Sequence, residues 1–234
     1  KLLEKHIDKK TKGIILNYPT NPSGVSYRRK ELQEINKVLL KHKILCISDE
    51  VYGDLTYDFE HIAFPTLPKA KNNTVYFNGF SKSYAMTGWR VGFACGPQEI
   101  IAAMTKIHQY TIMCVPITSQ MAAAEALVSG RKSVEQMKRE YNRRRELMVT
   151  ELNSLGLKCS RPQGAFYVFP CIKSTGLSSL DFSRKLLEEE KVAVVPGTAF
   201  GLCAEGYIRI SYASSMDNLK EALLRIKRFL ERRK

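Results

Sequence analysis

The first 95 residues alternate short apolar runs with turns and one amphipathic segment. Four apolar runs have the length of buried strands, and they cover residues 13–18, 44–48, 74–78 and 90–95. Residues 29–42 carry apolar side chains at helical spacing, so we expect a helix between the first two strands. This alternation is typical of an α/β domain and predicts a mostly parallel sheet.

The rest of the chain shows mainly helical periodicity. We expect helices over residues 98–111, 119–128, 133–155, 180–190 and 216–232, and strands over residues 165–169, 192–195 and 207–212. Gly156 is placed to end the long third helix. The pattern after this helix is that of a compact α+β unit. We therefore expect two domains, residues 1–136 and residues 137–234.

The charge balance is basic, with 37 Lys and Arg against 23 Asp and Glu, a net charge of +14. Many of the basic residues fall in the expected helices near residues 138–145 and 227–234, where they alternate with apolar positions as on solvated helix faces. No zinc-finger, RNP-type or helix-turn-helix signature accompanies them, and no apolar run approaches the roughly 20 residues of a membrane span. We expect neither a nucleic acid nor a membrane as partner.

Six cysteines are spread along the chain without a CxxC pair, so the sequence predicts no metal site. Their spacing is also unlike that of a small disulfide scaffold. Cys46 and Cys95 fall in apolar, strand-like runs, and we expect both to be core thiols. This usage indicates a reducing compartment, the cytoplasm or a matrix.

Polar residues cluster where the expected strands of the first domain end. Ligands bind open α/β sheets outside the carboxyl ends of the strands, so these side chains are expected to converge on one rim. The residues concerned are Asn21, Asp49, Tyr52, Ser81, Lys82 and Arg90. Taken singly, each has an ordinary structural explanation, such as a turn asparagine or a core tyrosine. The set as a whole favours a site.

Four segments resemble the class I and II aminotransferases, which are fold-type I enzymes dependent on pyridoxal 5′-phosphate (PLP). They are Asn-Pro-Ser-Gly at 21–24, Ser-Asp-Glu-Val-Tyr at 48–52, Ser-Lys-Ser-Tyr-Ala-Met-Thr-Gly-Trp-Arg-Val-Gly at 81–92 and Arg209 in Tyr-Ile-Arg-Ile-Ser. They occur in the family's order and span nearly the whole chain. The resemblance implies an incomplete PLP-transferase large domain, layered α/β/α, followed by an α+β C-terminal small domain.

The resemblance also implies roles for the central residues. Lys82 matches the lysine that forms a Schiff base with PLP and then moves the proton at the substrate Cα. Asp49 matches the partner of the pyridinium nitrogen, whose protonation makes the ring an electron sink. Tyr52 matches the tyrosine that hydrogen-bonds the phenolic oxygen of the cofactor. The neighbouring Glu50 has no such match.

The remaining matches concern anion binding and the substrate. Ser81 and Arg90 match ligands of the cofactor phosphate, and Arg209 matches the arginine that binds the substrate α-carboxylate through its planar fork. Asn21 matches the asparagine that donates to the phenolic oxygen, and it also lies in the substrate site. One departure is Gly79, where the family often has a serine that binds the phosphate.

The implied reaction is transfer of an amino group from an amino acid to a 2-oxo acid. A PLP-dependent carbon–sulfur β-lyase of the same fold is the alternative, although such relatives often carry a histidine where this chain has Thr20. Homodimerisation is the family norm.

The chain begins at Lys1, and we expect it to be a fragment or a processed product. The family's phosphate-binding turn and ring-stacking aromatic residue are not in this sequence. An inactive or regulatory aminotransferase-like fragment therefore remains a further alternative.

Overall fold

The computed structural model describes residues 2–233 and contains two compact units. Unit 1 comprises Lys1–Pro19 and Ser26–Gln136, and unit 2 comprises Thr20–Val25 and Met137–Lys234. The boundary at residue 136 falls inside the long helix α6 (Arg131–Ser154). Among the described residues, the helices are all too short or too polar to cross a bilayer.

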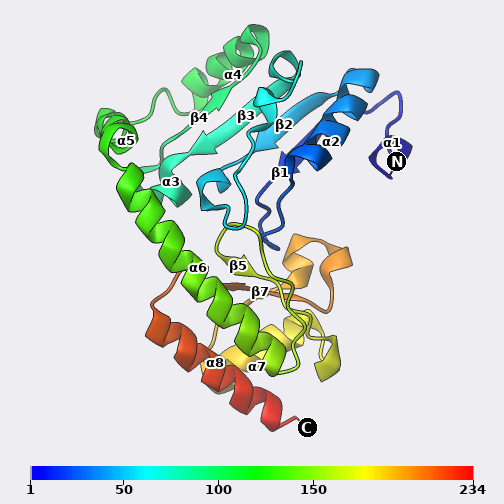
Figure 1. Ribbon diagram of the computed structural model, residues 1–234, viewed down its shortest axis with the longest axis vertical. Coiled ribbons are helices and arrows are strands. Elements are labelled where there is room, and N and C mark those ends of the chain that lie inside the picture. The colour runs from blue at the N-terminus through cyan, green and yellow to red at the C-terminus, as the bar shows by residue number, and fades with distance from the viewer. Residues whose placement is uncertain (1, 234) are drawn as a thin grey trace. The chain divides into compact units, whose positions relative to one another are not determined.

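Unit 1 is built on a four-stranded sheet with the order β1-β2-β3-β4 (Figure 1). Its strands are β1 (Gly13–Asn17), β2 (Leu45–Asp49), β3 (Thr74–Gly79) and β4 (Gly92–Cys95). The first three strands are parallel, and β4 pairs with β3 in the antiparallel direction. The predicted α/β domain with a mostly parallel sheet is confirmed.

One face of this sheet is covered by α2 (Arg29–His42), at the expected bounds. Its start is fixed by Glu31, which accepts a hydrogen bond of 2.8 Å from the backbone of Arg28. Its end is fixed by Lys43, which adopts a left-handed conformation. The apolar stripe of α2 packs on sheet residues in one buried cluster, which includes Leu16, Leu32, Leu39, Ile44 and Cys46.

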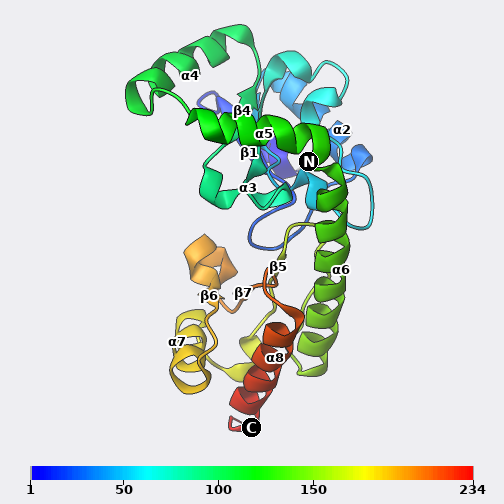
Figure 2. The same cartoon turned by 90° about the vertical axis from the view of Figure 1, so that its left-hand side faces the viewer.

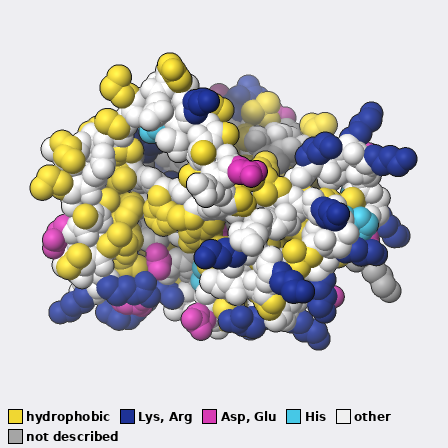
Figure 3. Space-filling model, turned by 90° about the horizontal axis from the view of Figure 1, so that it is seen from above, with side chains coloured by type: hydrophobic (Ala, Val, Ile, Leu, Met, Phe, Trp, Pro, Cys, Tyr) yellow, Lys and Arg dark blue, Asp and Glu magenta, His cyan; other side chains and the backbone are white. Residues whose placement is uncertain are grey.

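The other helices of unit 1 leave much apolar surface exposed. They are α1 (Leu2–Lys5), α3 (Phe80–Ser83), α4 (Gln98–Thr111) and α5 (Ile117–Ser129). Large apolar side chains stand exposed on or beside α4 and α5, among them Ile107, Tyr110, Met113, Met121 and Val128. Figure 3 shows hydrophobic side chains gathered toward the left of the view, with Lys and Arg at the right and along the lower edge.

Cys95 is exposed, so the expectation that it is a core thiol is wrong, whereas Cys46 is buried as expected. The difference follows from the order of the sheet, in which β4 has a strand on one side only and β2 lies between two strands. All six cysteines are free thiols in the structure.

Unit 2 contains a three-stranded antiparallel sheet with the order β5-β7-β6. The strands are β5 (Tyr167–Val168), β6 (Val195–Pro196) and β7 (Ile208–Ser211). Helices α6, α7 (Ser179–Glu190) and α8 (Met216–Glu231) pack together with this sheet (Figure 2). The strand expected over 192–195 begins only at Val195, because Val192 still closes the end of α7 by donating to the carbonyl of Leu186.

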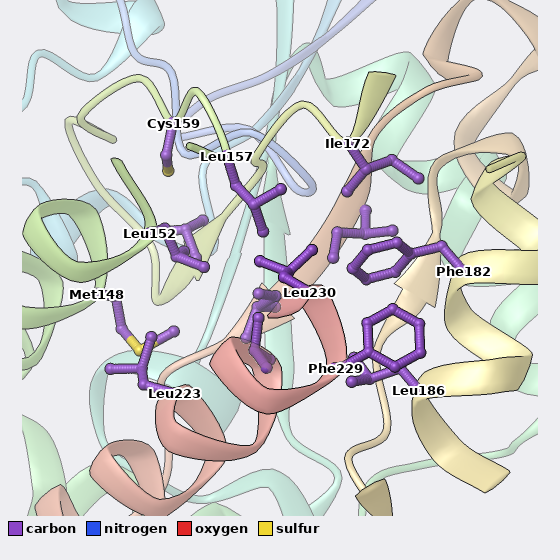
Figure 4. Close-up of a cluster of buried hydrophobic side chains, with 14 of the residues drawn as sticks. Met148, Leu152, Leu157, Cys159, Ile172, Phe182, Leu186, Leu223, Phe229 and Leu230 are labelled. Carbon is purple, nitrogen blue, oxygen red and sulfur yellow. The ribbon is translucent and has the colours of Figure 1, made fainter. Parts of the chain in front are cut away.

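The core of unit 2 is a single cluster of buried apolar side chains contributed by all three helices and the sheet (Figure 4). Phe182 from α7 and Phe229 from α8 meet edge to face, with ring centroids 5.1 Å apart. Met148 and Leu152 from α6 are fully buried in the same cluster. These contacts make unit 2 a well-packed scaffold for the short strands that it carries.

Candidate active site

The ends of β2 and β3 bring three of the predicted site residues to one region of unit 1. The two strands are parallel, and Asp49 at the end of β2 pairs with Phe77 of β3. Lys82 lies just beyond the end of β3, in the short helix α3. Its Nζ atom lies 5.8 Å from the centroid of the Tyr52 ring, and Tyr52 itself is buried. An amine, a carboxylate and a phenol thus follow neighbouring strand ends.

Asp49 has a hydrogen-bond partner, Asn17, that was not among the residues predicted from the sequence. The side-chain amide of Asn17 donates to Oδ2 of Asp49 over 3.1 Å and lies 3.3 Å from its backbone oxygen. Asn17 is the last residue of β1 and lies in register with Asp49. Its position at a strand end, on the same rim as the predicted residues, is the signal that could have identified it.

Ser81 and Arg90 lie at the two ends of a closed loop. The Thr87 hydroxyl donates to the backbone oxygen of Ser81 over 2.7 Å, and Nη1 of Arg90 donates to the backbone oxygen of Thr87 over 2.7 Å. Arg90 has a left-handed backbone (φ 54°), so β4 begins at Gly92 instead of residue 90. The exposed guanidinium of Arg90 keeps donors beyond the one that holds the loop.

Gly79 occupies a place where the strands leave little room for a side chain. It pairs with Gly92 across β3 and β4, and a Cβ atom at position 79 would lie 3.1 Å from Cα of Gly92. Two glycines therefore allow the close approach of the backbones directly before α3. This is a physical reason for the departure from serine at this position.

Asn21 and Arg209 are joined in unit 2. Nη1 of Arg209 donates to Oδ1 of Asn21 over 2.7 Å. The guanidinium carbon lies 4.5 Å from the ring centroid of Tyr167 and 5.0 Å from that of Phe200, so two aromatic rings fix its plane. Nε of Arg209 is buried and has no hydrogen-bond partner among the described residues. A buried donor of this kind is suited to a carboxylate ligand.

The loop that carries Asn21 is anchored within unit 2 through Gly24. The backbone oxygen of Gly24 accepts hydrogen bonds from the backbone nitrogens of Gln163 and Gly164 over 2.8 and 2.9 Å. Nη1 of the buried Arg145 donates to the backbone oxygen of Pro162 over 2.7 Å and so holds the other side of this contact. These anchors could not be identified from the sequence, because they join segments far apart in the chain.

The chain belongs to the family described as aminotransferase class I and II, which it matches over residues 1–226. Members of this family use PLP as their cofactor.

Among similar proteins is the Bacillus subtilis protein YugH, named as an aminotransferase on a provisional basis, with 52% identity over 98% of this chain. An aspartate aminotransferase of Pyrococcus abyssi is 46% identical over 99% of this chain. The chain spans about 60% of the length of these curated relatives.

Solved structures agree with this membership. The aromatic aminotransferase of Pyrococcus horikoshii superposes with a TM-score of 0.96 at 46% identity, over 99% of this chain and 63% of that one. The aspartate aminotransferase of Thermus thermophilus with maleate gives a TM-score of 0.92 at 38% identity, over 97% of this chain and 59% of that one. The fold expected from the resemblance, a PLP-transferase large domain with a small domain, is confirmed.

The residues of this chain fit the family's cofactor in their chemistry. Asp49 offers an acceptor for a protonated ring nitrogen, and Tyr52 offers a hydroxyl donor. Ser81 and Arg90 offer a hydroxyl and a cationic fork, both suited to a phosphate. Lys82 offers the amine that an aldehyde requires.

Proposed function

We propose that the complete protein carrying this chain is a PLP-dependent aminotransferase, which moves an amino group between an amino acid and a 2-oxo acid. The observation that carries the proposal is the grouping of Lys82, Tyr52 and Asp49 at neighbouring strand ends, with Lys82 Nζ 5.8 Å from the Tyr52 ring centroid. Bound PLP supplies the electron sink that makes the substrate Cα acidic. Binding of the cofactor, binding of the substrate and transfer of the proton are carried out by side chains of the protein.

Lys82 is the catalytic residue in this proposal. Its amine would hold the cofactor aldehyde covalently and, when free, would move the proton at the substrate Cα. The carboxylate of Asp49 holds a proton on the ring nitrogen, and the amide of Asn17 orients that carboxylate. Tyr52 donates to the phenolic oxygen of the cofactor, a role that Asn21 shares.

Two anionic groups are bound in this proposal, the cofactor phosphate and the substrate α-carboxylate. Ser81 and Arg90 bind the cofactor phosphate in the loop that Thr87 closes. Arg209 binds the α-carboxylate of the substrate with its guanidinium fork, which the rings of Tyr167 and Phe200 hold in one plane. Asn21, hydrogen-bonded to Arg209, completes the carboxylate site.

The two units correspond in this proposal to domains of the family. Residues 1–136 form part of the PLP-binding large domain, and residues 137–234 form the C-terminal small domain. The complete protein acts as a homodimer, which is supported by the exposed apolar side chains on α4 and α5 (Figure 3). Six free cysteines support a reducing compartment, the cytoplasm.

The decisive experiment replaces Lys82 by alanine in the complete protein, with Lys37→Ala as the matched control at an exposed position. Borohydride treatment in the presence of PLP should leave a covalent pyridoxyl group on Lys82 in the unvaried protein and in the control. The K82A protein should lose this modification and its turnover. Unchanged turnover and absorbance in K82A would refute the proposal.

A product assay separates the proposed reaction from a carbon–sulfur β-lyase. We expect amino transfer from an amino acid to 2-oxoglutarate. Pyruvate and ammonia released from cystathionine would instead show the lyase. Absence of cofactor binding by the complete protein would indicate a degenerate domain.

A further inference from the structure

Glu50 lies between two of the proposed cofactor residues, Asp49 and Tyr52, yet its carboxylate is completely buried. It accepts a hydrogen bond of 2.7 Å from the Ser48 hydroxyl and one of 2.9 Å from the backbone nitrogen of Phe64. Its other oxygen lies 2.5 Å from Nε2 of His61. Burial of a carboxylate is costly unless such partners compensate it, so this set of contacts has to be maintained together.

His61 also packs against the backbone of the segment that follows Glu50, at Gly53. A Cβ atom at position 53 would lie 2.8 Å from Cδ2 of His61, so the imidazole packs directly on the bare backbone of Gly53. The Tyr18 ring lies 5.2 Å from the imidazole, and its hydroxyl donates to the backbone oxygen of Ile62 over 2.9 Å. Nδ1 of His61 is buried and has no hydrogen-bond partner among residues 2–233, so the ring contacts Glu50 through Nε2 alone.

The backbone from Glu50 to Gly53 is thereby fixed at each end. The backbone nitrogen of Glu50 donates to Phe77 of β3 over 3.0 Å, and that of Gly53 donates to the backbone oxygen of Glu50 over 2.8 Å. Together with the Glu50–His61 contact, these bonds leave the intervening turn little freedom. Asp49 directly precedes this turn and Tyr52 lies within it, so the orientation of both residues depends on the turn.

We propose that Glu50 and His61 are positioning residues that hold Asp49 and Tyr52 in the orientation required to bind the ring of PLP. The proposal rests on the proposed function, because it takes Asp49 and Tyr52 as cofactor ligands. Neither Glu50 nor His61 touches the reacting atoms in this scheme. Their effect passes through the turn at Glu50–Gly53 and the close contact with Gly53.

The test uses the complete protein with the variants His61→Leu, His61→Gln and Glu50→Gln. Glu60→Gln is the matched control, since Glu60 is an exposed acid next to His61 in the sequence. Three quantities are measured: the PLP dissociation constant of the PLP-free protein, the pH midpoint of the bound-cofactor absorbance, and the melting temperature without PLP. All three are readouts independent of turnover.

His61→Leu leaves one oxygen of Glu50 without its donor, and we expect about a tenfold weaker binding of PLP together with a shifted absorbance midpoint. His61→Gln restores an N–H donor and should recover most of the affinity. Glu50→Gln keeps an acceptor for Phe64 and should show a smaller loss in the same direction, which keeps the test valid if His61→Leu fails to fold. Glu60→Gln should match the unvaried protein.

A lower melting temperature with unchanged PLP affinity and absorbance midpoint, in both His61→Leu and Glu50→Gln, would overturn the positioning role and leave the proposed function intact. Equal affinities of His61→Leu and His61→Gln, with both folded, would also overturn it. Failure of the unvaried protein to bind PLP would instead overturn the proposed function, and the positioning role with it.

Discussion

Arg209 donates a hydrogen bond of 2.7 Å to Asn21, although 188 positions separate the two residues in the chain. The pair lies within unit 2, since Thr20–Val25 groups with Met137–Lys234. The amide of Asn21 leaves the guanidinium charge uncompensated, whereas a carboxylate partner would neutralise it. An arginine held in this way keeps its charge for an anionic ligand, and its unpartnered Nε provides a second donor.

The first prediction concerns the planar guanidinium group of Arg209. Arg209→Lys keeps the charge but loses the planar pair of donors and the stacking on Tyr167 and Phe200. In the complete protein we expect the KM for the amino acid to rise about 10- to 100-fold, the loss typical of hydrogen bonds to a charged group. Steady-state kinetics measures this, with Arg184→Lys, at an exposed position of α7, as control. Equal KM values for the two variants would contradict the role.

The second prediction concerns the anchor of the Asn21 loop. Gly24 has φ 68°, and a Cβ atom there would lie 2.4 Å from Cβ of Pro162. Gly176 has nearly the same backbone conformation (φ 69°) but open space around it, so it isolates the cost of the left-handed backbone. That cost is about 1 kcal/mol, and the steric clash should add about 1–3 kcal/mol in Gly24→Ala. Denaturant unfolding of the two alanine variants tests this, and equal losses would show that the loop yields without strain.

The sequence was sufficient for features that depend on local pattern. The bounds of α2 follow from the apolar spacing of residues 29–42, and the ends of β2 at Asp49 and of β3 at Gly79 lie within one residue of the ends expected from short apolar runs. The motif around Lys82 identified the family without any structure. Hydrophobic periodicity and strand-end polarity are encoded within a few neighbouring residues, which is why they can be recognised in one sequence.

Features that depend on tertiary contacts could not be predicted in this way. The exposure of Cys95 depends on β4 having a neighbour on one side only, which is a property of sheet order. Glu50 was passed over because its partner His61 is brought to it by an irregular loop. Gly24 contacts Pro162, which lies far from it in the sequence, so no local pattern indicates this contact.

The third prediction tests the core of unit 2 with two leucines of the same helix. Leu186 is fully buried among the side chains of α7 and α8, whereas Leu180 is largely exposed. Leu186→Ala should lower the free energy of unfolding by about 2–5 kcal/mol, through lost burial and the cavity left behind. Leu180→Ala should change it by less than about 0.5 kcal/mol. Chemical denaturation followed by circular dichroism measures both, and similar values would contradict the packing shown in Figure 4.

The fourth prediction concerns the two buried thiols. Burial raises the pKa of Cys46 to about 12, with a further contribution from the negative charge of Glu50, and burial raises the pKa of Cys159 to about 11. The ordinary value is 9.0. Because the folded pKa values lie above that of the unfolded chain, the unfolded state loses these protons first as the pH rises. Their contribution to stability is complete below pH 9 and is lost progressively between about pH 9 and pH 12.

The measurement is the free energy of unfolding at several pH values from 8 to about 10.5, a range chosen to cover the start of thiol ionisation. The double variant Cys46→Ala, Cys159→Ala should be less stable at pH 8, because it loses two buried side chains, but its stability should fall less steeply with pH. Cys203→Ala, at an exposed position, should keep the slope of the unvaried chain. Partly buried tyrosines such as Tyr76 have pKa values raised by burial and contribute a slope of the same sign to every variant, so the comparison isolates the thiols. If the free energy of unfolding falls with pH at the same rate in the double variant and in the control, Cys46 and Cys159 have the same pKa in the folded and the unfolded chain.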